Sequence, residues 1–309
     1  MKIVCLMENT VGNENCKSEH GLSLYIEMEK NTILVDTGAS GLFLENAENL
    51  DIDLKKVETV FLSHGHYDHG GGILEFHKVN STAEIVMQKS ALGDYWHKSE
   101  SVEKYIGLNP EIKELENLIL LDGDYEYYKK STNCNVDGIL SCENNEGQQK
   151  KAKDDTSERK NKIEIFTLRT ASKEELECWP KGNLVLKERK DNQYIQDSFI
   201  HEQYLILEEN GKFVLISGCA HNGILNILEE YHNRYEAYPD VVVSGFHMRK
   251  KEGYTEEDYE VIRETARQLK ETGILCYTGH CTGEEPYQLM KEIMEEKLEY
   301  LHCGNGISL

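Results

Sequence analysis

The sequence predicts an α/β protein in which two mixed β-sheets form a sandwich and helices cover the outer faces. Three observations support this fold class. Strand and helix signals alternate in the first part of the chain, they alternate again from residue 162 onward, and hairpin signals occur in both parts. Strand–helix–strand units and hairpins together are typical of layered α/β domains with mixed sheets.

The first part of the chain contains four predicted strands and two predicted helices. Residues 22–28 and 32–36 are joined by a polar turn at Glu29–Asn31, so they predict paired strands. Residues 57–63 form a short β-branched run, which is typical of a buried strand. The fourth strand is expected at 83–88, and the helices are expected at 41–50 and from the glycine run to about residue 78.

The second part of the chain repeats this organisation. Residues 203–218 form two alternating runs on either side of Asn210-Gly211, the dipeptide that most favours a tight hairpin turn. Further strands are expected at 162–168, 240–246 and 273–278, and helices are expected at 222–235, 255–271 and 284–297.

The middle of the chain differs in composition from both parts. Residues 129–161 are rich in Lys, Asp, Asn, Glu, Ser and Gln and contain few apolar residues. A segment of this kind buries little apolar surface, so it predicts a surface insertion, with a substrate lid as the alternative. We therefore expect residues 1–309 to form a single domain that carries an insertion at about 129–161.

Aromatic residues gather between 94 and 128. They predict either the lining of a pocket for a flat ring or the ordinary packing of a loop. The residues are Tyr95, Trp96, Tyr105, Tyr125, Tyr127 and Tyr128.

The charge of the chain restricts its partners. The 309 residues include 34 basic and 56 acidic side chains, which give a formal net charge of −22. Such a charge repels phosphate backbones and anionic membrane surfaces, so we expect no nucleic-acid partner and no membrane partner. A small anionic substrate is still compatible, because a bound metal ion can outweigh the global field locally.

The cysteine pattern indicates a reducing compartment. Nine cysteines are scattered singly along the chain, and an odd number without regular spacing does not form a disulfide framework. The start of the sequence has no full apolar core and no small-residue cleavage site, and the chain has no run of eighteen apolar residues. We therefore expect a cytoplasmic protein with reduced thiols.

A cluster of histidines carries the main chemical signal. The segment His64-x-His66-x-Asp68-His69 contains three of the twelve histidines within six residues, between a predicted strand and a glycine run. Imidazole and carboxylate groups together are ligands for divalent metals such as zinc and iron. Glycines at this point allow a tight backbone turn. We interpret the segment as a metal site, and the alternative is a polar loop that happens to be rich in histidine.

The remaining ligands are expected at other strand ends. His221, His247 and His280 each follow an apolar strand and lie close to glycine, and His247 is the weakest candidate. Cys219 is either a thiolate ligand or a small buried residue beside the site. Asp36 either orients a ligand histidine or caps a turn. Six further histidines lack this setting and are expected on the surface or in the core: His20, His77, His97, His201, His232 and His302.

These residues resemble the metallo-β-lactamase fold superfamily. Within it, the later blocks resemble the branch of the 7,8-dihydropterin-6-yl-methyl-4-(β-D-ribofuranosyl)aminobenzene 5′-phosphate synthase-like proteins. The resemblance covers about residues 1–125 and 162–309. The blocks that carry it are the histidine segment at 64–69, Asp36-Thr37-Gly38, DSFIHEQYLIL at 197–207, SGCAHNGILNIL at 217–228, SGFHM at 244–248 and YTGHCTG at 277–283.

The resemblance implies an αββα four-layer sandwich with a two-metal site at one edge of the sheets and a water or hydroxide between the ions. Cys219 stands where many hydrolases of the superfamily have a bridging Asp, and this departure leaves the number of ions open. By position, one ion would be held by His64, His66 and His221, and the other by Asp68, His69 and His280.

The first functional hypothesis is a binuclear metallohydrolase that uses a metal-bound hydroxide on a small ester or phosphoester. Asp68 would ligate metal and orient the nucleophile, and His247 would bind or protonate the leaving group. The expected cofactors are two divalent ions, with zinc preferred over iron and manganese.

Two alternatives remain. The branch name implies a transferase that joins a pterin pyrophosphate to an arylamine nucleotide, and a third hypothesis is a non-catalytic metal-holding sensor on the same fold. The expected partner is a small-molecule substrate, phosphorylated or pterin-like. The oligomeric state is left open by the sequence.

Overall fold

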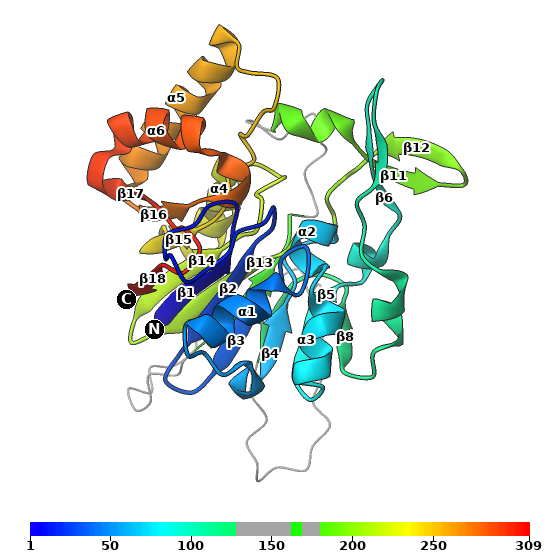
Figure 1. Cartoon of the computed structure of the whole chain (residues 1–309). Coiled ribbons are helices and arrows are strands. Elements are labelled where there is room, and N and C mark those ends of the chain that lie inside the picture. The colour runs from blue at the N-terminus through cyan, green and yellow to red at the C-terminus, as the bar shows by residue number, and fades with distance from the viewer. Residues whose placement is uncertain (128–161, 169–179) are drawn as a thin grey trace, which may run out of the picture.

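The computed structural model describes residues 1–127, 162–168 and 180–309, and two seven-stranded sheets form its centre (Figure 1). The first sheet has the strand order β18-β1-β2-β3-β4-β5-β8. Strands β18, β1, β2 and β3 pair antiparallel, whereas β3, β4, β5 and β8 pair parallel. The strands are β1 (Lys2–Met7), β2 (Ser23–Glu27), β3 (Thr32–Val35), β4 (Thr59–Phe61), β5 (Glu84–Gln88), β8 (Leu118–Leu121) and β18 (Gly306–Ser308).

The second sheet has the order β17-β16-β15-β14-β13-β10-β9. Strands β9, β10, β13 and β14 pair antiparallel, and β14, β15, β16 and β17 pair parallel. Both sheets are therefore mixed in the same way. The strands are β9 (Tyr125–Tyr127), β10 (Lys162–Phe166), β13 (Tyr204–Glu209), β14 (Lys212–Ile216), β15 (Val241–Val243), β16 (Leu275–Thr278) and β17 (Leu298–Tyr300).

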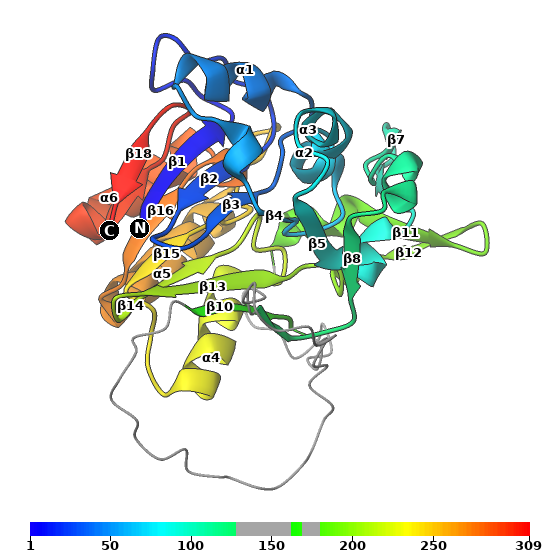
Figure 2. The ribbon, with the colours of Figure 1, turned by 90° about the horizontal axis from the view of Figure 1, so that it is seen from below.

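Helices cover the outer faces of the two sheets. Figure 2 shows α1 and α3 on one side of the sandwich and α4 on the opposite side. Two apolar clusters join α1 and α3 to the first sheet and α4, α5 and α6 to the second. The helices are α1 (Leu42–Asn49), α2 (Tyr67–Gly70), α3 (Ile73–Val79), α4 (Ile224–Tyr235), α5 (Glu256–Thr272) and α6 (Glu284–Met294).

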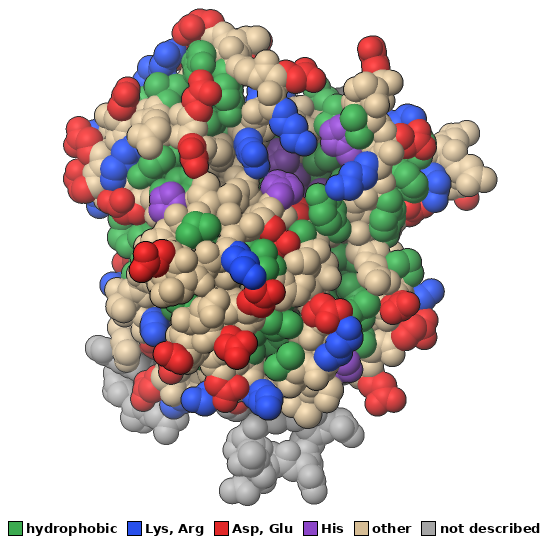
Figure 3. Space-filling model, viewed as in Figure 1, with side chains coloured by type: hydrophobic (Ala, Val, Ile, Leu, Met, Phe, Trp, Pro, Cys, Tyr) green, Lys and Arg blue, Asp and Glu red, His purple; other side chains and the backbone are tan. Residues whose placement is uncertain are grey.

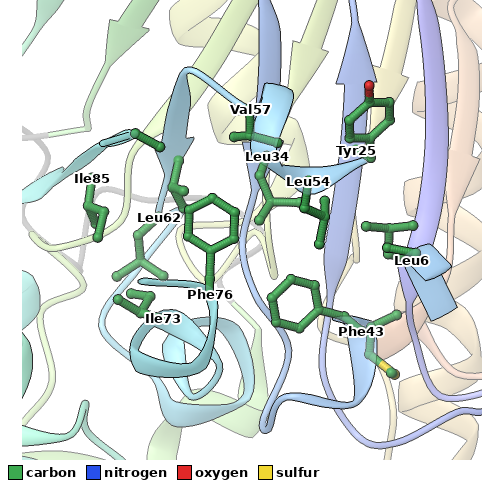
Figure 4. Close-up of a cluster of buried hydrophobic side chains, with 14 of the residues drawn as sticks. Leu6, Tyr25, Leu34, Phe43, Leu54, Val57, Leu62, Ile73, Phe76 and Ile85 are labelled. Atoms are coloured by element: carbon green, nitrogen blue, oxygen red, sulfur yellow. The ribbon is translucent and has the colours of Figure 1, made fainter. Parts of the chain in front are cut away.

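The alternation of side chains along each strand builds a layered core. Val35 of β3 packs in the core between the sheets, together with Val214 of β14. Leu34 points to the other face, where it shares a buried cluster with Phe43 of α1 and Phe76 of α3 (Figure 4). Two sheets enclosed by two helical layers confirm the predicted fold class, an αββα four-layer sandwich.

The predicted hairpin is also confirmed. Strands β13 and β14 pair antiparallel across Asn210 and Gly211. The φ angles of these two residues are 55° and 77°, as a type I′ turn requires.

Several strands were not predicted. Strand β1 ends just before the buried Glu8, and β17 and β18 have three residues each, which is too short for a recognisable pattern. A third sheet has the order β12-β11-β6-β7 and is built from largely polar sequences. Its strands are β6 (Tyr95–Lys98), β7 (Glu103–Tyr105), β11 (Leu186–Lys190) and β12 (Gln193–Gln196).

The third sheet explains part of the aromatic segment at 94–128. The ring of Trp96 lies 5.5 Å from the ring of Tyr105 and 5.9 Å from that of Tyr194, measured between centroids. These rings pack on one another within the sheet.

The predicted insertion at 129–161 lies outside the described residues, so the insertion and the single domain stay predictions. Among the helices of the described ranges, none combines the length and the apolar character that crossing a membrane requires.

The start of α5 offers a test of the fold. Thr255 and Asp258 form a capping box, in which the Thr255 hydroxyl accepts a hydrogen bond from the Asp258 backbone N–H at 3.3 Å and Asp258 Oδ2 accepts one from the Thr255 N–H at 2.9 Å. Thr255→Ala should lower the free energy of unfolding by about 1 kcal/mol, measured by urea denaturation. The exposed Ser101→Ala is the matched control, and equal effects of the two changes would contradict the capping role.

Candidate metal centre

The loops that follow β3, β4, β14, β15 and β16 meet at one edge of the sandwich. Strands β3 and β4 are parallel neighbours, and so are β14, β15 and β16, so within each sheet their carboxyl ends share an edge. These loops carry the side chains that the sequence singled out: Asp36, His64, His66, Asp68, His69, Cys219, His221, His247 and His280.

The first cluster consists of His64, His66 and His221. One ring nitrogen from each histidine lies within 4.8 Å of one ring nitrogen of each of the other two. All three side chains are buried. Their Nε2 atoms have no hydrogen-bond partner among the described residues. Buried polar atoms are almost always hydrogen-bonded, so three converging, unpartnered imidazole nitrogens fit a divalent metal ion.

Polar neighbours orient two of these rings. His64 Nδ1 lies 2.9 Å from the Ser63 hydroxyl, and His221 Nδ1 lies 2.9 Å from Oδ1 of Asn183. Such a contact on one ring nitrogen turns the other toward a metal position. The Asn183 amide also donates to the His221 carbonyl at 2.7 Å, which fixes the ring and its backbone together.

The second cluster consists of Asp68, His69 and His280. The Nε2 atoms of His69 and His280 are 3.1 Å apart, and Asp68 Oδ2 lies 3.9 Å and 3.5 Å from them, respectively. Cys219 Sγ lies 3.1 Å from the same His69 Nε2. One carboxylate oxygen and two imidazole nitrogens therefore lie within 4 Å of one another, and this donor set suits a divalent ion. The thiol of Cys219 lies beside His69 and His64.

Asp36 contacts His69 at Nδ1, the ring nitrogen opposite the one that faces Cys219 and His280. Its Oδ2 lies 2.6 Å from His69 Nδ1 and accepts a hydrogen bond from the Ser63 hydroxyl at 2.7 Å. Its Oδ1 accepts the Ser63 backbone N–H at 2.7 Å. This carboxylate thus joins the ends of β3 and β4 and sets the orientation of the His69 ring.

The two clusters differ in proton affinity. Burial, reinforced by the neighbouring histidines, holds the pKa values of His64 and His221 well below the usual range. Burial also acts against protonation of His69, but Asp36 and Asp68 outweigh it and raise its pKa to about 9. The first cluster is therefore neutral at pH 7, and His69 carries a proton.

His247 lies against the first cluster. Its ring centroid is 4.2 Å from that of His221, and its backbone N–H donates to Cys281 Sγ at 3.3 Å. One ring nitrogen of His247 and the Sγ atoms of Cys219 and Cys281 lie within 4.8 Å of one another. All the predicted site residues are therefore gathered at one edge of the sheets.

Two histidines that the sequence analysis set aside also contact the site. His201 accepts the Gly65 N–H at 3.0 Å, and its Nε2 lies 3.1 Å from Asp197 Oδ2. His20 Nε2 lies 3.2 Å from Oδ2 of Asp68. The spacing of Asp197 and His201 by four residues was the available signal, whereas nothing in the local sequence marked His20.

Comparison with known proteins agrees with this fold. Residues 19–130 match the family model of the metallo-beta-lactamase superfamily. A solved metal-dependent hydrolase of the beta-lactamase superfamily superposes with a TM-score of 0.73, at 24% sequence identity, over 100% of this chain and 99% of that one.

Residues 19–130 carry a metallo-beta-lactamase superfamily domain, and the chain has the metallo-β-lactamase fold.

Two relatives span nearly the whole length of this chain. A Methanocaldococcus jannaschii protein named 7,8-dihydropterin-6-methyl-4-(beta-D-ribofuranosyl)-aminobenzene-5′-phosphate synthase is 28% identical, over 99% of this chain and 96% of its own length. An uncharacterized protein of the same organism is 27% identical, over 99% of this chain and 100% of its own length. The metallo-beta-lactamase fold protein YhfI from Bacillus subtilis superposes with a TM-score of 0.52, at 12% identity, over 99% of this chain and 98% of that one.

The two clusters predict separable losses of metal. His66→Ala should remove the ion of the first cluster and His280→Ala that of the second, so that each variant retains about one ion of two. Elemental analysis of protein purified without added metal measures this. The exposed His232→Ala is the matched control. A single ion per chain that is insensitive to His280→Ala would contradict the two-ion assignment.

The raised pKa of His69 predicts proton release from the second cluster only. Because this pKa is about 9, the protonated form dominates at pH 7.5, and an ion must displace about one proton from the His69 ring. Affinity of the second cluster should therefore rise with pH up to about 9, whereas the first cluster, with lowered histidine pKa values, should show no dependence above about pH 6.5.

Zinc titration calorimetry in two buffers of different ionisation enthalpy measures these protons. His66→Ala isolates the second cluster and His280→Ala isolates the first. Equal proton release by the two variants would rule out this assignment of the pKa values.

Proposed function

We propose that this protein is a metal-dependent hydrolase of a small ester or phosphoester. The observation that carries the proposal is the pair of adjoining clusters, above all the three buried Nε2 atoms of His64, His66 and His221 that have no hydrogen-bond partner among the described residues. In the proposal, these three histidines hold one divalent ion. Asp68, His69 and His280 hold the other, and Cys219 is a further ligand.

The preferred ion is zinc, with iron and manganese as alternatives, because imidazole and carboxylate ligands suit all three. When bound, such ions lower the pKa of water and polarise the oxygen of an ester or phosphoryl group.

Asp68 is suited to hold the attacking group in place. Its side chain is nearly buried, and although burial alone would raise its pKa, His69, His20 and His280 hold that pKa well below the usual range. The carboxylate is therefore ionised at neutral pH. It can accept a hydrogen bond from the nucleophile while it remains beside His69 and His280.

His247 is suited to act on the leaving group. It is half-buried, it contacts the His221 ring, and its Nδ1 has no hydrogen-bond partner in the described part of the chain. A histidine in this position can bind the departing oxygen or donate a proton to it.

A synthase-type transferase is the second candidate function. The supporting observation is the similarity to the named M. jannaschii synthase along nearly the whole length of both chains. In that reaction type a pterin pyrophosphate would be joined to an arylamine nucleotide, with the metal ions holding the pyrophosphate. The proposed substrate is in either case a small molecule, phosphorylated or pterin-like.

We also propose a cytoplasmic location. The free cysteines of the described residues support it: Cys5, Cys16, Cys219, Cys276, Cys281 and Cys303.

Hydrolysis can be tested with chromogenic substrates. Zinc-loaded protein should hydrolyse 4-nitrophenyl acetate or bis(4-nitrophenyl) phosphate, and a chelator should abolish the reaction. Asp68→Asn and His247→Gln should each lower kcat by about 10²-fold or more, because each removes a group that handles a proton or the nucleophile. His232→Gln is the matched control.

The metal content of each variant must be measured alongside its rate. The contrary outcome is that the protein joins a pterin pyrophosphate to an arylamine nucleotide while it hydrolyses neither 4-nitrophenyl acetate nor bis(4-nitrophenyl) phosphate. That result would replace the hydrolase proposal by the transferase proposal.

A further inference from the structure

A cavity of about 350 Å³ opens beside the metal centre. It lies between the start of α4, the loop after β15 and the first half of α5. Sites for small molecules usually measure roughly 300 to 1,000 Å³. The cavity is therefore large enough for a compact organic group.

His247 connects the cavity to the metal centre. The residue lines the cavity, and on its other side the ring contacts His221 of the first cluster. Gly182 also lines the cavity, and a Cβ atom added there would lie 3.1 Å from His247 Nε2. His247 is therefore the residue that the cavity lining and the first cluster have in common.

The walls of the cavity are mainly apolar. Phe246 and Ile262 are buried beneath it, whereas Val261 is 46% exposed although it is a large apolar residue on α5. Ile224, Leu225 and Met248 also line it. Apolar walls with few polar groups favour a ring or a compact hydrocarbon group.

Three cations and two carboxylates line the same cavity: Lys181, Arg249 and Lys250, with Asp258 and Glu264. Lys181 and Lys250 form ion pairs with Glu257 and Asp258, at 2.8 Å and 2.6 Å, respectively. Arg249 also lines the cavity, and in the described ranges no carboxylate lies within ion-pair distance of its guanidinium.

Figure 3 shows Lys and Arg side chains gathered around a hollow in which histidines are visible. An unpaired arginine at such a place suits an anionic group.

We propose that this cavity binds the non-reacting part of the substrate, an apolar ring that bears an anionic substituent. The ring lies against Val261 and Ile262, and the anion pairs with Arg249. The bond that reacts lies at the metal centre, on the far side of His247. The assignment of the occupant as substrate rests on the proposed function, whereas the binding of a ring with an anion can be tested independently.

The test uses naphthalene-1-sulfonate, which has a flat ring and a fixed anion but no ester bond. Titration calorimetry with zinc-loaded protein should show binding at least about tenfold tighter than that of methanesulfonate or 1-naphthol. Equal affinity for 1-naphthol would overturn the pairing of the anion with Arg249.

Two variants locate the binding site of the probe. Val261→Trp fills the cavity from an exposed position and should weaken binding about tenfold or more. Arg249→Gln should weaken binding of the sulfonate about fivefold and leave 1-naphthol unchanged. The matched controls are Val79→Trp, at another exposed valine on a helix, and Arg263→Gln on α5, whose partners Glu256 and Glu260 do not line the cavity, and both should bind the probe as the parent does. Unchanged binding by Val261→Trp would show that the probe binds elsewhere.

The His66→Ala variant separates this proposal from the proposed function. It should lose hydrolysis together with the metal ion of the first cluster and still bind the probe with an affinity within about twofold of the parent's. Loss of probe binding together with the metal would place the sulfonate on the ion and overturn the cavity assignment. Retained probe binding in a parent protein without hydrolytic activity would contradict the proposed function alone.

Discussion

The buried imidazole nitrogens at the site edge of the sandwich need a hydrogen-bond partner or a metal ion. An unpaired polar group inside a protein costs roughly 1 to 3 kcal/mol, and the first cluster contains three such Nε2 atoms among the described residues. A bound cation would remove this cost, so metal binding and stability should be linked. The packing of the loops after β4 and β14 depends on the same constraint, because these loops carry the three side chains.

The loops reach the site only through unusual backbone geometry. Asp36, Ala220, His247 and His280 have φ angles between 50° and 59°, although none of them is glycine. Left-handed conformations of this kind cost about 1 to 3 kcal/mol each and persist only where tertiary contacts impose them. The backbone at Gly218 passes so close to Ser63 that a Cβ atom added at Gly218 would lie 2.2 Å from the Ser63 hydroxyl oxygen.

Charge is organised on two scales in this protein. The chain as a whole carries −22, which opposes nucleic acids and anionic surfaces. At the cavity beside the metal centre, however, Arg249 has no carboxylate within ion-pair distance among the described residues, and metal ions would add positive charge nearby. A small anion can therefore be attracted to a local field that a large polyanion would not reach.

The sequence by itself determined the fold class and the nine side chains of the predicted site. Strand and turn signals are local, and the spacing from His64 to His69 at a strand end is a local pattern too. Only the tertiary structure decided which nitrogens face one another, because His66 and His221 are brought together by two different sheets. The same holds for His20, whose contact with Asp68 leaves no trace in the adjoining sequence. The third sheet was also decided by pairing between distant, largely polar strands, since hydrogen bonds between backbones impose no apolar pattern on the sequence.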